Sequence, residues 1–165
     1  MELSNGERKY LLGVVLTQSE YGWTRLKWVA DLFGVKLPTA KEFLDSLTKK
    51  GLLDYQKRGA ISLTKKGKEL ADKELKKLNT IVEFITRCLY IDKEVAMRNA
   101  LKIMFDLDEI LAERMYQFIE VMNKCAASPR PVFIRKFEDY VRTGEYIPCA
   151  VCPYKMEGGM EVDGK

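Results

Sequence analysis

Residues 25–51 read RLKWVADLFGVKLPTAKEFLDSLTKKG, and this stretch decides the fold. Apolar residues recur at helical spacing in its first part, and the helix expected over residues 25–33 stops at Gly34. Pro38 then lies where proline is tolerated, in the first turn of a second helix that runs to Lys50. Two short helices joined by a tight glycine turn, the second of them polar, predict a helix-turn-helix.

The segments on either side extend this motif to a winged helix. Upstream, the apolar residues between Tyr10 and Val15 recur at helical spacing and predict a further helix. Downstream, residues 52–56 and 61–63 form two short strand-like runs, and Lys57-Arg58-Gly59-Ala60 separates them. The sequence therefore predicts a hairpin with a basic tip, which is the wing.

Helices are expected throughout the rest of the chain. A long helix is predicted from Thr64 to Leu89, because its apolar residues recur at three- and four-residue steps. Further helices are expected over residues 93–105, 106–122 and 132–141. The predicted fold class is therefore mainly α, with a winged helix-turn-helix at its N-terminal end.

Composition limits the classes of function. A chain of 165 residues with 47% hydrophobic content is too small for a large enzyme, and its lack of histidine removes the commonest general base. No run reaches the ~18 apolar residues of a membrane span, and the first residues are polar, so we expect a cytoplasmic protein and no membrane partner. Residues 1–75 hold 14 Lys and Arg against 10 Asp and Glu, whereas residues 76–165 hold 14 of each. The basic excess therefore lies in the predicted winged helix, as expected for phosphate binding.

Two stretches carry a resemblance to a known family. They are Val35-Lys-Leu-Pro-Thr-Ala-Lys-Glu-Phe-Leu-Asp-Ser-Leu-Thr-Lys-Lys-Gly-Leu-Leu-Asp-Tyr55 and Arg58-Gly-Ala-Ile-Ser-Leu-Thr-Lys-Lys-Gly-Lys-Glu-Leu-Ala71. They resemble the diphtheria toxin repressor and manganese transport regulator family over residues 8 to about 122. The resemblance implies a homodimeric repressor of a palindromic double-stranded DNA operator. Together with the predicted elements, it leads us to expect three parts: a winged-helix DNA-binding domain (1–73), an α-helical dimerisation domain (74–128) and a C-terminal helix with a cysteine-containing tail (129–165).

The resemblance also assigns DNA contacts. Arg25 stands where the family contacts backbone phosphate, at the start of the second helix of the chain. The start of the recognition helix is expected to read bases and phosphates through Lys36, Pro38, Thr39, Ala40 and Lys41. Small apolar groups suit thymine methyls, and lysines suit phosphates or guanine edges. On the wing, Lys57 and Arg58 are expected to hold the flanking backbone.

The metal-sensing residues of the family are replaced. Its motif, roughly Glu-Ala-Cys-x-x-Glu-His, aligns with Asn99-Ala-Leu-Lys-Ile-Met-Phe105, and Lys9 stands at the ligand of the first helix. The positions of the ancillary ligands hold Leu78, Val82 and Met97. Methionine sulfur is a soft ligand, but methionine at helical spacing usually fills a core. Apolar side chains do not coordinate iron(II) or manganese(II), so the usual sensing mechanism is not expected.

Four cysteines are the candidate replacement: Cys88, Cys125, Cys149 and Cys152. An antiparallel return of the helices brings Cys125 back towards Cys88, and a Cys-x-x-Cys pair directs two sulfurs at one ion. We expect an iron-sulfur cluster, [4Fe-4S], because Cys152-Pro153 is similar to the end of ferredoxin cluster motifs. Zinc or iron(II) held by thiolates, a thiol-disulfide switch, and cysteines of purely structural role are the alternatives.

The predicted function is a repressor-like transcriptional regulator of iron, sulfur or redox homeostasis that senses through the cysteines. A winged-helix module that binds another protein is the alternative. An enzyme is not expected: a thiol oxidoreductase built on Cys149 and Cys152 would need a nearby cation or helix N-terminus, and Lys155 is the nearest cation in sequence.

Overall fold

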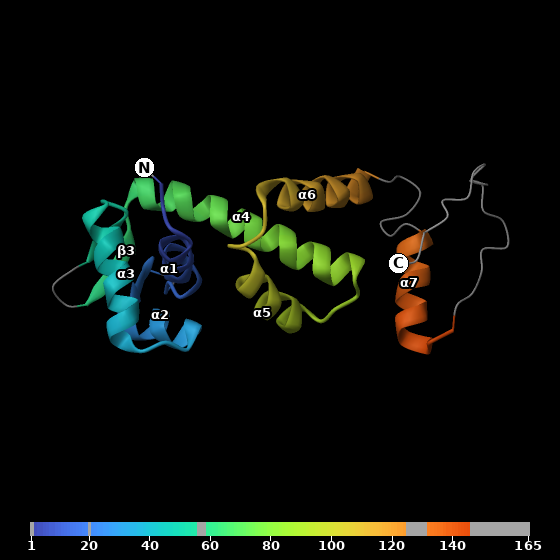
Figure 1. Ribbon diagram of the computed structural model, residues 1–165, viewed down its shortest axis with the longest axis horizontal. Coiled ribbons are helices and arrows are strands. Elements are labelled where there is room, and N and C mark those ends of the chain that lie inside the picture. The colour runs from blue at the N-terminus through green and yellow to red at the C-terminus, as the bar shows by residue number, and fades with distance from the viewer. Residues whose placement is uncertain (1, 20, 56–58, 125–131, 146–165) are drawn as a thin grey trace, which may run out of the picture.

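The computed structural model describes residues 2–19, 21–55, 59–124 and 132–145. Seven helices and three short strands are found in this part of the chain (Figure 1). In chain order they are α1 (Asn5–Leu16), β1 (Trp23–Arg25), α2 (Leu26–Phe33), α3 (Leu37–Lys49), β2 (Leu53–Tyr55), β3 (Ala60–Leu63), α4 (Lys65–Cys88), α5 (Lys93–Ile103), α6 (Glu109–Lys124) and α7 (Val132–Thr143). None of the described helices is both long and apolar enough to cross a membrane. The mainly helical fold class is confirmed.

The predicted winged helix is present, with one strand more than expected. The helix-turn-helix is formed by α2 and α3, and β2 pairs antiparallel with β3 in the hairpin. The additional strand, β1, pairs with the other edge of β3, so the sheet order is β1-β3-β2. Only Thr24 of its three residues is buried, and so short a segment shows no alternation that would reveal a strand in the sequence.

Helix α1 begins earlier than its apolar residues indicate. Ser4 accepts a hydrogen bond from the Glu7 amide, and the Glu7 carboxylate accepts one from the Ser4 amide, which is a capping box. The signal Ser4-x-x-Glu7 was present in the sequence. The polar residues before Tyr10 show no apolar periodicity, so periodicity alone places the start of this helix too late.

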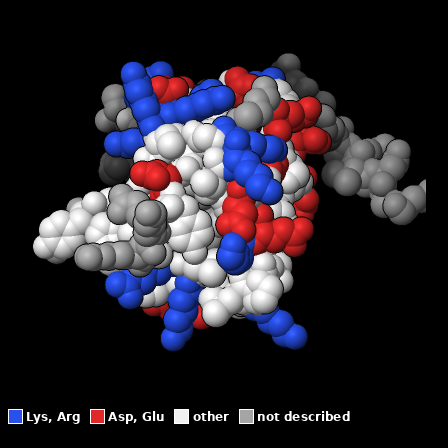
Figure 2. Space-filling model, turned by 90° about the vertical axis from the view of Figure 1, so that its left-hand side faces the viewer, with Lys and Arg blue, Asp and Glu red and all other residues white. Residues whose placement is uncertain are grey.

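The winged-helix core is a cluster of buried apolar residues contributed by α1, α2, α3, the hairpin and the start of α4. In it, the ring of Tyr10 stacks on that of Phe43 with centroids 4.5 Å apart and meets Phe33 edge-on at 5.4 Å. Aromatic pairs of this kind contribute ~0.5–1.5 kcal/mol beyond the area they bury. Seen from this end of the molecule, Lys and Arg side chains project around the edge of the uncharged surface (Figure 2).

Helix α4 joins the winged helix to the helical half of the molecule. Its N-cap Thr64 accepts from the Gly67 amide and donates to the Gly51 carbonyl at 2.8 Å. A Cβ atom at Gly67 would lie 1.9 Å from the carbonyl oxygen of Leu52, so only glycine allows this close approach. The helix runs without a break across the predicted boundary at residue 73, and α5 and α6 pack against it (Figure 1).

A second core, the helical core, lies around α4 and α5. Its buried members are Leu12, Leu78, Ile81, Val82, Ile85, Ala96, Ala100 and Met104. Leu12 comes from α1, so this helix contributes to both cores. Farther along, a small cluster joins Cys88, Met122 and Ile134, the last from α7.

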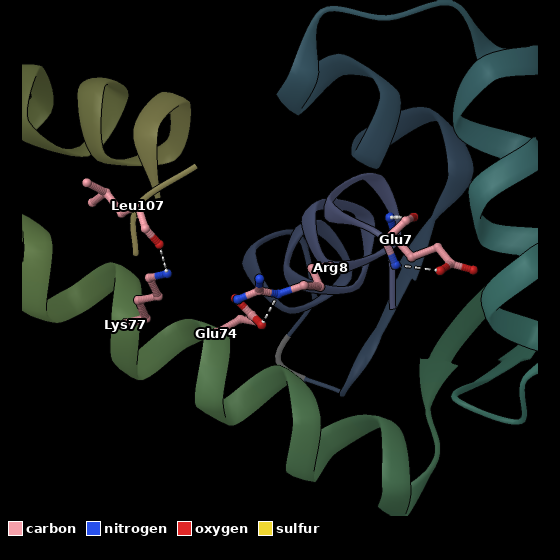
Figure 3. A network of polar contacts seen from close by, with 6 residues as sticks. Glu7, Arg8, Glu74, Lys77 and Leu107 are labelled. Carbon is pink, nitrogen blue, oxygen red and sulfur yellow. Dashed lines mark hydrogen bonds and ion pairs between the residues drawn. The ribbon is translucent and has the colours of Figure 1, made fainter. Parts of the chain in front are cut away.

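One buried carboxylate fixes α1 to the far end of α3. Glu7 accepts hydrogen bonds from the hydroxyl of Ser46 at 2.8 Å and from the ammonium of Lys50, whose ion pair measures 2.6 Å. The Lys50 hydrogen bond, followed by those of Ser4 and Ser46, lowers the pKa of Glu7 from its ordinary 4.5 to about 2. Figure 3 shows Glu7 beside Arg8 on α1.

Replacing this carboxylate should change how the stability depends on pH. Because the folded pKa lies below the unfolded one, ionised Glu7 stabilises the fold above about pH 4.5, and this contribution is lost as pH falls towards 2. We expect Glu7→Gln to lower the free energy of unfolding by about 1–3 kcal/mol at pH 7, and the difference from wild type to shrink below pH 4.5. Urea unfolding at a series of pH values measures both quantities.

The matched control is Glu2→Gln, because Glu2 is exposed on the same terminal segment. Its substitution should leave the stability within ~0.5 kcal/mol of wild type at every pH. The role given to the carboxylate would be contradicted if the difference in free energy of unfolding between Glu7→Gln and wild type stayed the same down to pH 2.

Candidate nucleic-acid interface

The turn between α2 and α3 sets the direction of the recognition helix. Gly34 adopts the left-handed conformation, with φ 63° and ψ 34°. The amide of Val35 then donates to the carbonyl of Ala30 at 3.1 Å, which closes the end of α2. Lys36 caps the start of α3 in an extended conformation, and Pro38 lies in its first turn as expected.

The start of α3 presents four neighbouring side chains to solvent. Lys36, Pro38 and Thr39 are all exposed, as is Leu37 between them. No hydrogen bond or ion pair among the described side chains involves Lys36 or Thr39, so both are available to a partner. Leu37 was not among the predicted contacts, because an apolar residue at a helix start reads in sequence as a core residue. At 48% exposure it belongs instead to this surface.

Ala40 corrects the predicted contact set. Its side chain is fully buried and belongs to the winged-helix core. Ala40 follows Leu37, Pro38 and Thr39 on the first turn of α3, and the face it occupies is the one that packs inward with Leu44 and Leu47. A base cannot reach its methyl group in this arrangement.

Lys41 is exposed but already has a partner. Its ammonium lies 2.5 Å from a carboxylate oxygen of Asp45, one turn later on α3. The hydrogen bond to Asp45 raises the pKa of Lys41. A phosphate contact by Lys41 would therefore have to compete with Asp45, unlike a contact by Lys36.

Arg25 is held by two tryptophans that were not among the predicted site residues. It ends β1 and caps α2, and its side chain is exposed. The guanidinium carbon lies 5.4 Å from the Trp23 ring centre and 5.8 Å from that of Trp28, and the two rings stack at 5.4 Å. Such cation–π contacts restrict a long side chain without neutralising it. The spacing of aromatic residues two before and three after an arginine was the available signal.

The predicted wing contacts lie outside the described residues. Lys57 and Arg58 fall between Tyr55, the last residue of β2, and Gly59. Tyr55 pairs with Ile61 across the hairpin, and Arg25 pairs with Ala60 on the other side of β3. The described strands thus connect the base of the wing directly to the residue at the start of α2.

Polar contacts connect α1 to the helical half (Figure 3). The guanidinium of Arg8 forms a two-point ion pair with Glu74 of α4, with distances of 2.6 and 3.1 Å. Farther along α4, the ammonium of Lys77 donates to the Leu107 carbonyl at 3.0 Å. The orientation of the recognition helix is therefore linked through α1 to α4 and to the segment between α5 and α6.

The positions that the family resemblance gives to metal ligands do not fit a divalent ion. Met104 and Leu78 are fully buried in the helical core, and Val82 is almost fully buried there. The ammonium of Lys9 lies 4.7 Å from the ring centre of Phe33. These groups offer no anionic or imidazole ligand, and an ammonium repels a cation. Among the described residues, no three His, Cys, Asp or Glu side chains gather into a possible metal site.

Of the four predicted cysteine ligands, only Cys88 lies within the described residues. It is buried at the end of α4, and its thiol lies 3.7 Å from the sulfur of Met122. Burial raises the pKa of the Cys88 thiol, which favours the protonated form over the thiolate that binds metals. Cys125, Cys149 and Cys152 lie outside the described residues, so their convergence on Cys88 stays a prediction.

Comparison with known proteins places the fold and the family. No family model matches the sequence. An uncharacterized HTH-type transcriptional regulator of Methanocaldococcus jannaschii is 32% identical over 92 residues, which make up 56% of this chain and 74% of that protein. Among solved structures, a hypothetical protein from Sulfolobus solfataricus aligns with a TM-score of 0.50 and 19% identity, over 76% of this chain and 95% of that one.

Two regulators of known structure share the fold. IdeR of T. acidophilum aligns with a TM-score of 0.59 and 21% identity, and the manganese regulator SloR with 0.54 and 20%. Each alignment covers 73% of this chain and 55% of the other, so the chain spans about half the length of these two proteins. The functions stated in the names of the relatives are regulatory and not enzymatic. The expected resemblance is confirmed in the fold, and the chain belongs to the same family of HTH-type transcriptional regulators as the Methanocaldococcus jannaschii protein.

Proposed function

We propose that the chain is a sequence-specific DNA-binding repressor whose α3 enters the major groove of an operator. The observation that carries this proposal is the start of α3, where Lys36, Pro38 and Thr39 are exposed together on a helix anchored at both ends. Family membership supports the same assignment. The described fold also supports it, because a helix-turn-helix followed by a hairpin is a common means of docking a helix in the groove.

The proposed contacts divide into those that position the protein and those that read bases. Arg25, restrained by its two tryptophans, is suited to backbone phosphate at the start of α2. The Pro38 ring and the Thr39 methyl group are suited to thymine methyls, and Lys36 to phosphate or a guanine edge. Lys57 and Arg58 on the wing remain predicted phosphate contacts.

Substitutions on α3 should separate these two kinds of contact. We expect Lys36→Ala to weaken binding to all sequences alike and to reduce the slope of log K against log salt by about 1. Thr39→Ser, which removes only the methyl group, should cost about 1 kcal/mol on the preferred site and little on other DNA. Binding is measured by fluorescence anisotropy on a site selected from random duplexes, at several salt concentrations.

Lys73→Ala is the control, because Lys73 is an exposed cation on α4 outside this surface. It should leave specific affinity and salt slope close to wild type. If DNA affinity is weak and insensitive to both α3 substitutions, the module would instead bind a protein partner.

The proposed repressor acts as a homodimer, because a palindromic operator requires two recognition helices. Helix α6 packs on α4 through Ile119 and Met122, which are buried. Four apolar side chains of α6 nevertheless remain exposed, namely Ile110, Leu111, Phe118 and Val121, with Val121 at 69%. Of these, Phe118 also meets Phe84 of α4 edge-on at 5.8 Å. Several exposed apolar side chains on one helix are typical of an interface, and we assign them to contact with a second copy of the chain.

Introducing charge among these side chains should dissociate the dimer. We expect Val121→Glu to raise the dimer dissociation constant at least about tenfold, because tenfold corresponds to ~1.4 kcal/mol and burying an unpaired carboxylate costs more. Sedimentation equilibrium measures the change. Lys124→Glu places the same charge at an exposed site one turn later and should leave the dimer intact. A monomeric wild-type protein, or a Val121→Glu protein that dimerises normally, would overturn the assignment.

The proposed input is an iron-sulfur cluster held by the cysteines, whose occupancy alters the spacing of the two recognition helices. Two features support it: the Cys149-x-x-Cys152 pair, and the absence of suitable ligands at the positions that the resemblance gives to the divalent-metal site. The environment of Cys88, by contrast, favours a buried, protonated thiol. A cluster would affect DNA binding only if it were held differently in the two states of the dimer. Zinc held by the same thiolates is the alternative cofactor.

The cofactor proposal is tested on protein purified without oxygen. Wild type should show broad visible absorption with stoichiometric iron and sulfide, and the double variant Cys149→Ser/Cys152→Ser should lose both signals. Cys88→Ala tests the fourth ligand separately, because alanine also suits a small buried site. Metal content that the double variant leaves unchanged would overturn the tail site, and one zinc per chain without colour would replace the cluster by zinc.

A further inference from the structure

We propose that the groove between α1, α2 and α5 binds a small organic anion with an apolar body, such as an aliphatic or aromatic carboxylate. The binding itself is independent of the function proposed above. Only its consequence, a change in operator affinity, rests on that function.

The groove has the size and the apolar lining of a small-molecule site. Its volume is about 930 Å³, and sites for drug-sized ligands are typically ~300–1,000 Å³. Met97, Leu101 and Phe105 line it at successive four-residue steps of α5 and just beyond, and Leu32 and Phe33 of α2 face them. A four-residue step places Met97 and Leu101 on one face of α5, and Phe105, just beyond the helix, extends this apolar wall.

Cations surround this apolar lining. The groove is lined by four basic residues, Lys9, Lys93, Arg98 and Lys102, against the two acidic residues Glu94 and Asp106. Arg98 and Lys102 lie one turn apart on α5, adjacent to the apolar stripe. In the described part of the chain, the side chains of Lys93, Arg98 and Lys102 form no ion pair and no hydrogen bond. An excess of unpaired cations around an apolar wall is complementary to an anionic head group on an apolar body.

Other ligand classes fit less well. A divalent cation would meet four basic groups, and no three potential ligands gather among the described residues. A neutral apolar molecule would gain nothing from the exposed cations, which water would continue to solvate. The ammonium of Lys9 lies over the Phe33 ring, so at this point a cation adjoins the apolar wall. A ligand with a charged group next to an apolar body can contact both.

The groove lies between the two halves of the molecule, so a ligand bound there can affect their arrangement. One wall comes from α1 and α2 of the winged helix, and the other from α5 of the helical half. A ligand that fills the groove contacts both halves at once and favours the arrangement in which these walls lie closest. Lys9, Met97, Leu101 and Phe105 also occupy positions that the family resemblance gives to metal ligands, so an organic ligand here would take the place of the lost ion.

The test uses two anionic probes and one neutral competitor with the whole 165-residue chain. Fluorescence of 8-anilinonaphthalene-1-sulfonate should rise on saturable binding, and decanoate should displace it whereas neutral 1-decanol should do so at least about tenfold less effectively. Arg98→Ala/Lys102→Ala should weaken binding of both anions about tenfold or more. Met97→Trp, which fills the groove without removing charge, should abolish saturable binding.

The matched control is Lys66→Ala/Lys73→Ala, which removes two exposed charges of α4 outside the groove. It should bind both probes as wild type does, and circular dichroism with thermal melting should show every variant folded. The proposal is overturned if wild type does not bind, if 1-decanol displaces as well as decanoate, or if folded variants of the groove bind like wild type. Probe binding that persists in Met97→Trp would place the site elsewhere and overturn it as well.

Operator binding is measured separately with and without decanoate. A several-fold change that disappears in Arg98→Ala/Lys102→Ala supports the coupling of groove and recognition helix. Saturable decanoate binding in a protein that ignores DNA would overturn the proposed function and leave the groove assignment standing. Specific DNA binding by a protein that binds neither anion would overturn the groove assignment and leave the proposed function standing.

Discussion

Both halves of the molecule depend on the packing of α1 from two sides. Tyr10, Leu11 and Val14 are buried in the winged-helix core, whereas Leu12 is buried in the helical core. Successive residues of a helix point about 100° apart, so one short helix supplies apolar surface in both directions. The polar residues at its start add to this, because Glu7 fixes the end of α3 and Arg8 binds Glu74 of α4. Few changes in α1 would leave the recognition helix and the helical half in their present relation.

This arrangement gives the functional assignment its physical basis. The exposed start of α3 is held at the Gly34 turn on one side and at the Glu7–Lys50 ion pair on the other, so its side chains are presented by a rigid element. The site that binds divalent metal in the resembled family is replaced by apolar side chains and cations, and a groove opens at several of the same positions. The chain thus shares its fold with the solved regulators, whereas the junction of its two halves presents apolar and cationic surface.

The sequence predicted most of the elements, and its failures have identifiable physical causes. Gly34, Pro38 and the hairpin residues are strong local signals, and the helix-turn-helix and wing strands were found where they were expected. Strand β1 was missed, because three residues are too few for a periodic pattern and its pairing with β3 is non-local. The early start of α1 was not predicted, although Ser4 and Glu7 form a capping-box signal in the sequence. Among the DNA contacts, Ala40 was assigned wrongly, since residue type and proximity to Pro38 say nothing about which face of α3 packs inward.

By itself the sequence determined the order of helices and strands, because this order follows from local periodicity and turn residues. The resemblance of residues 35–71 to a known family then indicated the family and the replaced metal ligands. The tertiary structure alone decided which side chains are available and what surrounds them. Glu7 acquires its low pKa from Lys50, 43 positions along the chain, and Arg25 is restrained by rings on two different elements. The groove likewise exists only because α5, packed on α4, lies opposite α1 and α2. Exposure, electrostatics and cavities depend on contacts between distant segments, and no local pattern encodes the distance between two segments.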